Sequence, residues 1–169
     1  NLEAMNPDCV VIRHSSSGAP HMIARCLKSS VVNAGDGAHE HPSQALLDLF
    51  TVKERLGEIK GLNIAIIGDI AHSRVARSNI HGFTKLGANV IVCGPPTMIP
   101  IGIESLGCRV TYDMNEAIKS ADVIMMLRLQ LERQKNGLFP SVREYSGLYG
   151  LNKERLKKSK QGVLIMHPG

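Results

Sequence analysis

Short apolar runs alternate with segments of helical periodicity, and this alternation is the feature that most restricts the fold of the chain. In the second part of the chain the runs have the length of buried strands, and they occupy 62–67, 90–93, 109–112, 122–127 and 163–166. Helices are predicted between them, at 74–86, 98–106, 113–120 and 152–159. Strands separated by helices form parallel sheets with right-handed crossovers, and near-continuous apolar strands are covered on both faces. The pattern therefore predicts an α/β fold with a five-stranded parallel sheet flanked by helices.

The first 41 residues carry the same alternation in an incomplete form. Apolar runs at 9–12 and 31–34 flank a predicted helix at 20–27. Residues 1–6 contain no initiator methionine at the start and resemble the tail of a helix, so we expect this first doubly wound domain to be only partly present. The expected division of the chain is the C-terminal part of a first domain at 1–41, a bridging helix at 42–57, and a second domain at 58–169 that is incomplete at its C-terminus.

A glycine-punctuated turn at 33–41 leads into the predicted bridging helix. Proline is tolerated in the first helical turn because its missing N–H would have no partner there, which places Pro42 at N1 and His41 at the N-cap. Gln44 follows three residues later, so its side chain is expected near His41. A buried apolar stripe should hold the helix in place, and it consists of Ala45, Leu49, Val52 and Leu56.

The position of His41 also predicts its chemistry. The positive end of the helix dipole disfavours a second positive charge, so the imidazole should be neutral and able to donate a hydrogen bond to a carbonyl oxygen. With the amide of Gln44 holding a neighbouring nitrogen, this arrangement would suit attack on a carbamoyl or acyl group. The alternative interpretation is an ordinary capped helix after a loop.

Polar residues collect where the predicted strands end. In an open α/β sheet, ligands bind outside the carboxyl ends of the strands. The residues at these ends are Arg13-His14, 36–44, 69–74, 128–130 and His167-Pro168. Arginine forks bind carboxylates and phosphates in a bidentate manner, so Arg13, Arg74 and Arg128 indicate a dianionic substrate. Arg74 could instead cap a neighbouring helix or pair with Asp69.

Several other function classes lack their sequence signals. The chain has a net charge of +5, but its basic residues are scattered and only 4% of its residues are aromatic, so nucleic-acid binding is not expected. No G-x-G-x-x-G follows the strand at 62–67, which argues against NAD. His14, His39 and His41 lack an acidic or cysteine partner at a known spacing, so no metal site is predicted, and no cofactor is expected.

The sequence also predicts a soluble, cytoplasmic protein. No apolar run is long enough to span a bilayer, and no signal segment opens the chain, so no membrane partner is expected. The four cysteines form no C-x-x-C pair and lie mostly among apolar residues, so Cys9, Cys26, Cys93 and Cys108 are predicted to be reduced core residues.

Five separate motifs resemble the catalytic chains of the aspartate transcarbamoylase family, in order and over nearly the whole sequence. They are Arg13-His14, then 34–37 with 41–48, then Gly68-Asp69 with 74–78, then 128–133, and last 167–169. The resemblance implies transfer of a carbamoyl group from carbamoyl phosphate to L-aspartate in pyrimidine biosynthesis. It also implies that the first domain binds carbamoyl phosphate and the second binds aspartate.

The resemblance implies roles for individual residues. Arg13 and His41 would contact the carbonyl oxygen of carbamoyl phosphate, Arg13 also its phosphate, and Gln44 its amino group. The two carboxylates of aspartate would be held by Arg74, Arg128 and Gln130. The backbone at His167 and Pro168 would accept from the carbamoyl NH₂. Catalysis would depend on positioning and on stabilising the oxyanion, without a metal or a covalent intermediate.

The resemblance further implies a homotrimer with active sites shared between chains, and leaves open regulatory chains or dihydroorotase as partners. The family's phosphate-binding Ser-x-Arg-Thr loop is absent from this sequence, so we expect about half of such a protein, and the sequence leaves open whether this part is active alone.

Two alternatives remain at this stage. One is ornithine carbamoyltransferase, against which stand Arg128-x-Gln130 and Ser43, where the ornithine enzymes usually carry cysteine. The other is a non-catalytic, transcarbamoylase-like assembly module.

Overall fold

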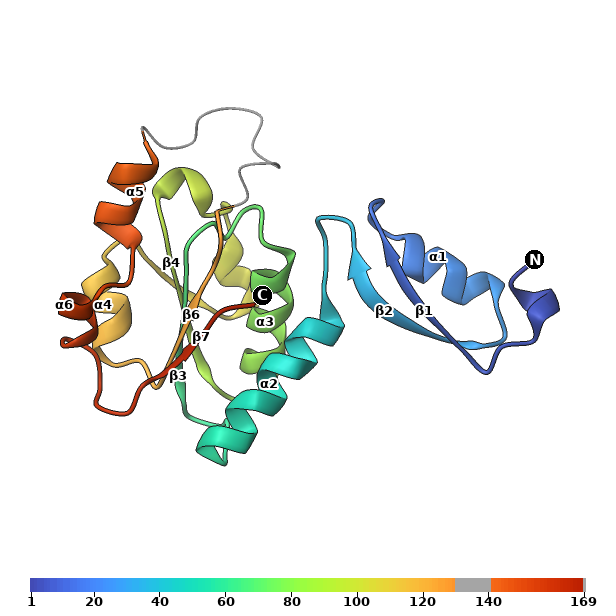
Figure 1. Cartoon of the computed structure of the whole chain (residues 1–169), viewed down its shortest axis with the longest axis horizontal. Coiled ribbons are helices and arrows are strands. Elements are labelled where there is room, and N and C mark those ends of the chain that lie inside the picture. Colours follow the sequence, from blue (N-terminus) through green and yellow to red (C-terminus); the bar gives the residue numbers. More distant parts are fainter. Residues whose placement is uncertain (130–140, 169) are drawn as a thin grey trace.

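Two lobes of unequal size are joined by one helix, α2 (Figure 1). The computed structural model describes residues 1–129 and 141–168. The smaller, N-terminal lobe contains a 3-10 turn at Glu3–Met5, strand β1 (Cys9–His14), helix α1 (Ala19–Cys26) and strand β2 (Ser30–Asp36). The two strands are parallel and paired, which confirms the predicted strand, helix and strand in this part of the chain.

The expected burial of the smaller lobe is wrong in two respects. The side chains of β1 alternate between half-buried and exposed, and Val11 is 68% exposed. Cys9 and Cys26 are exposed, whereas Cys93 and Cys108 are buried as predicted. The reason is that β1 pairs with β2 in a sheet of two strands, so an apolar run is not covered on both faces as it would be inside a larger sheet.

Helix α2 (Pro42–Leu56) begins as predicted, with His41 at the N-cap and Pro42 in the first turn. Its buried residues are Ala45, Asp48 and Val52, whereas Leu56 at the far end is 38% exposed. The inward face of α2 therefore includes the carboxylate of Asp48, which was not part of the predicted apolar stripe.

The larger lobe is built on a parallel sheet with strand order β5-β4-β3-β6-β7. The strands are β3 (Asn63–Ile67), β4 (Asn89–Cys93), β5 (Arg109–Thr111), β6 (Val123–Met126) and β7 (Leu164–Met166). The helices are α3 (Arg74–Lys85), α4 (Met114–Lys119), α5 (Val142–Tyr149) and α6 (Lys153–Leu156). The predicted five-stranded parallel sheet flanked by helices is thus confirmed.

Alternate residues of the central strands supply two separate cores. On β3, Ile64 and Ile66 pack with residues of α2 and α3, such as Val52 and Phe83. On the opposite face, Ala65 and Ile67 pack with residues of α4 and α5. Figure 1 shows α2 and α3 on one side of the sheet and α4, α5 and α6 on the other. Burial on both faces explains why the strands are continuous apolar runs.

The topology has a switch point beside β3. The chain runs from β3 outward to β4 and β5, then crosses to β6 and β7 on the other side. The segments after β3 and β6 lie in close contact, because a Cβ on Gly68 would be 3.0 Å from the carbonyl oxygen of Leu127. Ligands of open α/β sheets bind at such a point, beyond the carboxyl ends of the strands.

Two connecting segments differ from the predicted helices. In place of the α-helix predicted at 98–106, the chain forms 3-10 turns at Pro96–Met98 and Ile103–Leu106, because Pro100 and Gly102 interrupt the helix. Helix α5 was not predicted, and α6 is shorter than the predicted helix at 152–159. Among the described residues, no helix is both long and apolar enough to cross a membrane.

Candidate active site

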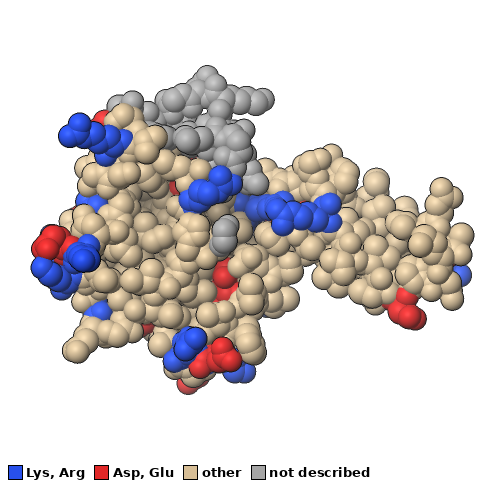
Figure 2. Space-filling view, viewed as in Figure 1, with Lys and Arg blue, Asp and Glu red and all other residues tan. Residues whose placement is uncertain are grey.

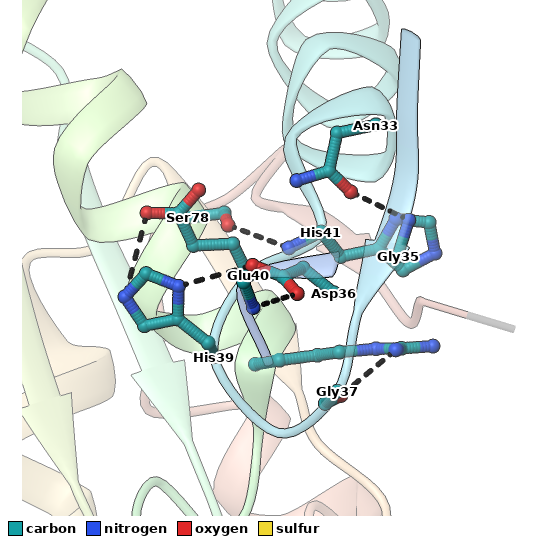
Figure 3. A network of polar contacts seen from close by, with 10 residues as sticks. Asn33, Gly35, Asp36, Gly37, His39, Glu40, His41 and Ser78 are labelled. Atoms are coloured by element: carbon teal, nitrogen blue, oxygen red, sulfur yellow. Dashed lines mark hydrogen bonds and ion pairs between the residues drawn. The ribbon is translucent and has the colours of Figure 1, made fainter. Parts of the chain in front are cut away.

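The turn between β2 and α2 is organised around the buried carboxylate of Asp36. Oδ1 of Asp36 accepts a hydrogen bond of 2.7 Å from the backbone N–H of Gly18, and Oδ2 lies 3.3 Å from Nδ1 of His39. The backbone N–H of Asp36 donates to the carbonyl oxygen of Glu40 at 2.8 Å. Figure 3 shows His39, Glu40 and His41 gathered around Asp36. These bonds fix the turn against the loop that follows β1.

His41 is held at the start of α2 by a contact with α3. Its backbone N–H donates to Oγ of Ser78 at 2.9 Å, and its Nδ1 lies 3.3 Å from Oγ of Ser43. Burial lowers the pKa of His41 below its ordinary value, and the positive charges of Arg74 and then Arg13 lower it further. This direction agrees with the predicted neutral imidazole. The causes are burial and the arginine charges, whereas the prediction was based on the helix dipole.

Arg74 lies buried at the first position of α3 and reaches back to the turn before α2. Its Nη1 donates to the carbonyl oxygen of Gly37 at 2.9 Å. A Cβ on Gly35 would lie 3.0 Å from the same nitrogen, so glycine at that position allows the guanidinium to approach the backbone. Ser73 caps the helix, since its Oγ accepts from the N–H of Ala76 at 3.1 Å. The cap and the turn together determine where the Arg74 guanidinium lies.

Gln44 belongs to a buried polar network that sequence reasoning missed. Its Nε2 donates to Oδ1 of Asp48, one turn further along α2, at 3.0 Å. Oδ2 of Asp48 accepts from Nδ2 of Asn79 on α3 at 2.7 Å. Burial raises the pKa of Asp48, while the hydrogen bonds from Asn79 and Gln44 act in the opposite direction. The missed signal is the position of Asp48, three residues after Ala45 on the inward face of the helix.

A third buried carboxylate follows β3 at the switch point. Asp69 is fully buried, and its Oδ1 lies 2.8 Å from Nδ1 of His72 and accepts from the backbone N–H of His72 at 3.2 Å. These contacts shape the loop that leads into α3, and no role was predicted for His72.

The remaining predicted residues follow β6 and β7. Arg128 and His167 are exposed, and Pro168 is half-buried. Since β3, β6 and β7 are parallel neighbours, these residues lie at the same edge of the sheet as Arg74. Gln130 lies outside the described residues. Figure 2 shows Lys and Arg side chains at the junction of the two lobes on the face in view.

Arg74 and Arg13 are both close enough to His41 for their charges to lower its pKa, and Arg128, His167 and Pro168 lie at the same sheet edge as Arg74. Within residues 1–129 and 141–168, no three His, Cys, Asp or Glu side chains are grouped so that they could hold a metal ion. A separate groove of about 700 Å³ between α2 and α3 is lined mainly by apolar groups such as Leu46 and Leu49 and contains none of the predicted site residues. A cluster of arginines beside a neutral imidazole is chemically suited to a small anion that carries a carbonyl group.

Comparison with known proteins gives matches over the whole chain. Residues 1–54 match the family described as "Aspartate/ornithine carbamoyltransferase, carbamoyl-P binding domain", and residues 60–169 match "Aspartate/ornithine carbamoyltransferase, Asp/Orn binding domain". The chain is 65% identical over 169 residues to the "Aspartate carbamoyltransferase catalytic subunit" of Desulforapulum autotrophicum, and covers 54% of that protein. It is 62% identical to the protein of the same name from Syntrophus aciditrophicus, of which it covers 55%.

Solved structures of the same kind also match. The aspartate transcarbamoylase of Trypanosoma cruzi in complex with carbamoyl phosphate has a TM-score of 0.83 at 26% identity, over 99% of this chain and 56% of that one. The same enzyme in complex with N-(phosphonacetyl)-L-aspartic acid has a TM-score of 0.78 at 26% identity, again over 99% of this chain and 56% of that one. The chain therefore spans about half the length of the relatives it matches.

Proposed function

The chain belongs to the aspartate/ornithine carbamoyltransferase family, and we propose that the protein containing it transfers the carbamoyl group of carbamoyl phosphate to L-aspartate. The products are N-carbamoyl-L-aspartate and phosphate, in pyrimidine biosynthesis. Relatives that are 65% and 62% identical carry the name aspartate carbamoyltransferase catalytic subunit, which supports aspartate over ornithine as the acceptor.

The observation that carries the proposal is the grouping of His41 with Arg74 and Arg13. The three residues come from three separate segments, yet the charges of both arginines lower the pKa of the imidazole. A neutral imidazole can donate a hydrogen bond to the carbonyl oxygen of carbamoyl phosphate without requiring a proton from solvent. Arg13 supplies positive charge for the phosphate and for the oxyanion that forms in the transition state.

The reaction then depends on placement of the two substrates. Arg13, His41 and Gln44 are the residues proposed for carbamoyl phosphate, with Gln44 contacting its amino group. Arg74, Arg128 and Gln130 are proposed for the carboxylates of aspartate, and the backbone of His167 and Pro168 for the carbamoyl NH₂. Holding the aspartate amine against the carbamoyl carbon makes the attack effectively unimolecular, and the departing phosphate takes the amine proton.

The division of the chain follows from this proposal. Residues 1–41 are the C-terminal part of the carbamoyl phosphate domain, 42–57 the bridging helix, and 58–169 the incomplete aspartate domain. The separate sheets on either side of α2 support this division. A cytoplasmic homotrimer with shared active sites is the proposed assembly, with regulatory chains or dihydroorotase as further candidate partners. The name "catalytic subunit" of the relatives supports an assembly of several chains.

An acceptor assay on the full-length protein tests the function. The protein is incubated with carbamoyl phosphate and either L-aspartate or L-ornithine, and the products are separated. We expect carbamoyl aspartate with the first acceptor and no citrulline with the second. Citrulline as the main product would overturn the assignment to aspartate, and no product with either acceptor would favour the non-catalytic module.

A further inference from the structure

Asp48 holds two side-chain amides at once on the inward face of α2. It is 4% exposed, Oδ1 accepts from Nε2 of Gln44 at 3.0 Å, and Oδ2 accepts from Nδ2 of Asn79 at 2.7 Å. Burial raises the pKa of Asp48, but both of its oxygens accept from N–H donors, and these bonds favour the ionised carboxylate, which has no proton to donate. Asp48 is thus surrounded by donors from two different helices.

This chemistry fixes the orientation of Gln44. An ionised carboxylate only accepts hydrogen bonds, so an amide beside it turns its nitrogen toward the carboxylate and its oxygen away. Asn79 shows how strong the preference is, because its buried Oδ1 has no hydrogen-bond partner among the described residues. Leaving a buried oxygen unpaired is costly, and a charge-assisted bond to Asp48 offsets that cost. The carboxylate therefore determines which end of each amide faces it.

We propose that Asp48 is a positioning residue that presents the oxygen of Gln44 to the carbamoyl donor, and so makes the site selective for a carbamoyl over an acyl phosphate. The inference rests on the proposed function, in which Gln44 contacts the amino group of carbamoyl phosphate. That NH₂ group needs an acceptor, which Oε1 of Gln44 supplies. Acetyl phosphate carries a methyl group in place of the NH₂ group and cannot form this hydrogen bond. If the Gln44 amide were reversed, its NH₂ group would face the NH₂ group of carbamoyl phosphate, and both groups are donors.

The test uses the full-length protein and a selectivity ratio. This ratio is the inhibition constant of acetyl phosphate, measured in competition with carbamoyl phosphate, divided by the KM for carbamoyl phosphate. Asp48→Asn keeps the shape of the side chain. In this variant the one side-chain oxygen at position 48 still accepts from Asn79, and the new NH₂ group faces Gln44. Gln44 must then turn its own oxygen toward position 48. We expect the KM for carbamoyl phosphate to rise about tenfold and the acetyl phosphate constant to change less than about twofold, so the ratio falls about tenfold.

Asn79→Ala is the matched control because it removes the other donor of the same network and leaves the bond between Gln44 and Asp48. Its melting temperature should fall, and its selectivity ratio should stay within about twofold of the wild-type value. Asp48→Ala provides the same test as Asp48→Asn if the latter does not fold, since Gln44 then has no fixed acceptor. An unchanged ratio in an active Asp48 variant would overturn the inference, as would an equal fall in Asn79→Ala. A wild-type protein that makes no carbamoyl aspartate would overturn the proposed function and this inference with it.

Discussion

At the scale of single residues, the proposed site depends on arginine charges that lie close enough to His41 to lower its pKa. The Arg74 guanidinium donates to the carbonyl of Gly37, and its charge together with that of Arg13 lowers the pKa of His41. A protonated imidazole beside two guanidinium groups would be electrostatically unfavourable. His41 is therefore kept in the form that donates one hydrogen bond and remains uncharged.

The titration of His41 tests this arrangement. Its pKa in the folded protein lies below the ordinary value of 6.5, so the imidazole should stay neutral as the pH falls through 6.5 and gain its proton only at lower pH. Since the unfolded chain takes up that proton first, this residue should reduce the stability of the native state as the pH falls below 6.5. NMR titration of the His41 ring, assigned with His41→Gln, measures the pKa. Arg74→Met should raise the pKa of His41, whereas a wild-type value at or above 6.5 would contradict the expected proximity.

Gly35 permits the approach of Arg74, and its replacement should affect both stability and substrate binding. Gly35 has φ of 138°, and an added Cβ would lie 3.0 Å from Arg74 Nη1. Gly35→Ala should lower the free energy of unfolding by about 1–3 kcal/mol and raise the KM for aspartate several-fold. Gly57→Ala is the control, since Gly57 also has positive φ but nothing within 4 Å of the added Cβ. It should destabilise the protein without changing the KM, and equal kinetic effects in both variants would contradict the role of Gly35.

At the scale of elements, two helix starts carry the imidazole and the guanidinium proposed for the site. His41 is the N-cap residue of α2, and Arg74 is the first residue of α3. The two helices are tied together by bonds from His41 to Ser78 and from Asn79 to Asp48. The relative position of the imidazole and the guanidinium is therefore set by helix packing as much as by the loops.

Removing the cap of α3 should lower stability and also displace Arg74, whereas removing a helix cap elsewhere should lower stability alone. Ser73→Ala deletes the hydrogen bond from Ala76 N–H, which should cost about 1 kcal/mol of stability and loosen the turn that carries Arg74. Asp113→Ala deletes the cap of α4, whose Oδ1 accepts from Asn115 N–H at 2.8 Å, on the other face of the sheet. Thermal unfolding should show a loss in both variants, but only Ser73→Ala should raise the KM for aspartate. A comparable rise in Asp113→Ala would indicate a general effect of destabilisation.

The elements with strong local signals could be predicted from the sequence, and those decided by context could not. The continuous apolar runs of β3 and β6 and the proline at the start of α2 predicted these elements correctly. Helix α5 was missed because Tyr145 and Tyr149 are its only buried residues, although Ser141 and Glu144 have the spacing of a capping box. The exposure of β1 and the contact between Asp48 and Asn79 depend on pairing between distant segments, which local periodicity does not encode.

At the scale of the whole molecule, the residues proposed for the site lie where the smaller lobe meets the switch point of the larger sheet. Arg13 lies near the end of β1 and His41 follows β2 in one lobe, whereas Arg74 and Arg128 follow β3 and β6, which are neighbouring strands of the other lobe. Figure 1 shows these strands. A substrate pair with one phosphate and two carboxylates suits a site that draws positive groups from both lobes. We infer that these groups bind one ligand together.

Isothermal titration calorimetry of the full-length protein with N-(phosphonacetyl)-L-aspartic acid, which joins a phosphonate to aspartate, measures whether they do. A ligand that engages both halves of the site at once should bind at least about a hundredfold more tightly than L-aspartate alone. We predict saturable binding of that strength in the wild-type protein and a loss of most of it in Arg128→Ala. No heat of binding, or an affinity no greater than that for L-aspartate, would contradict a shared site.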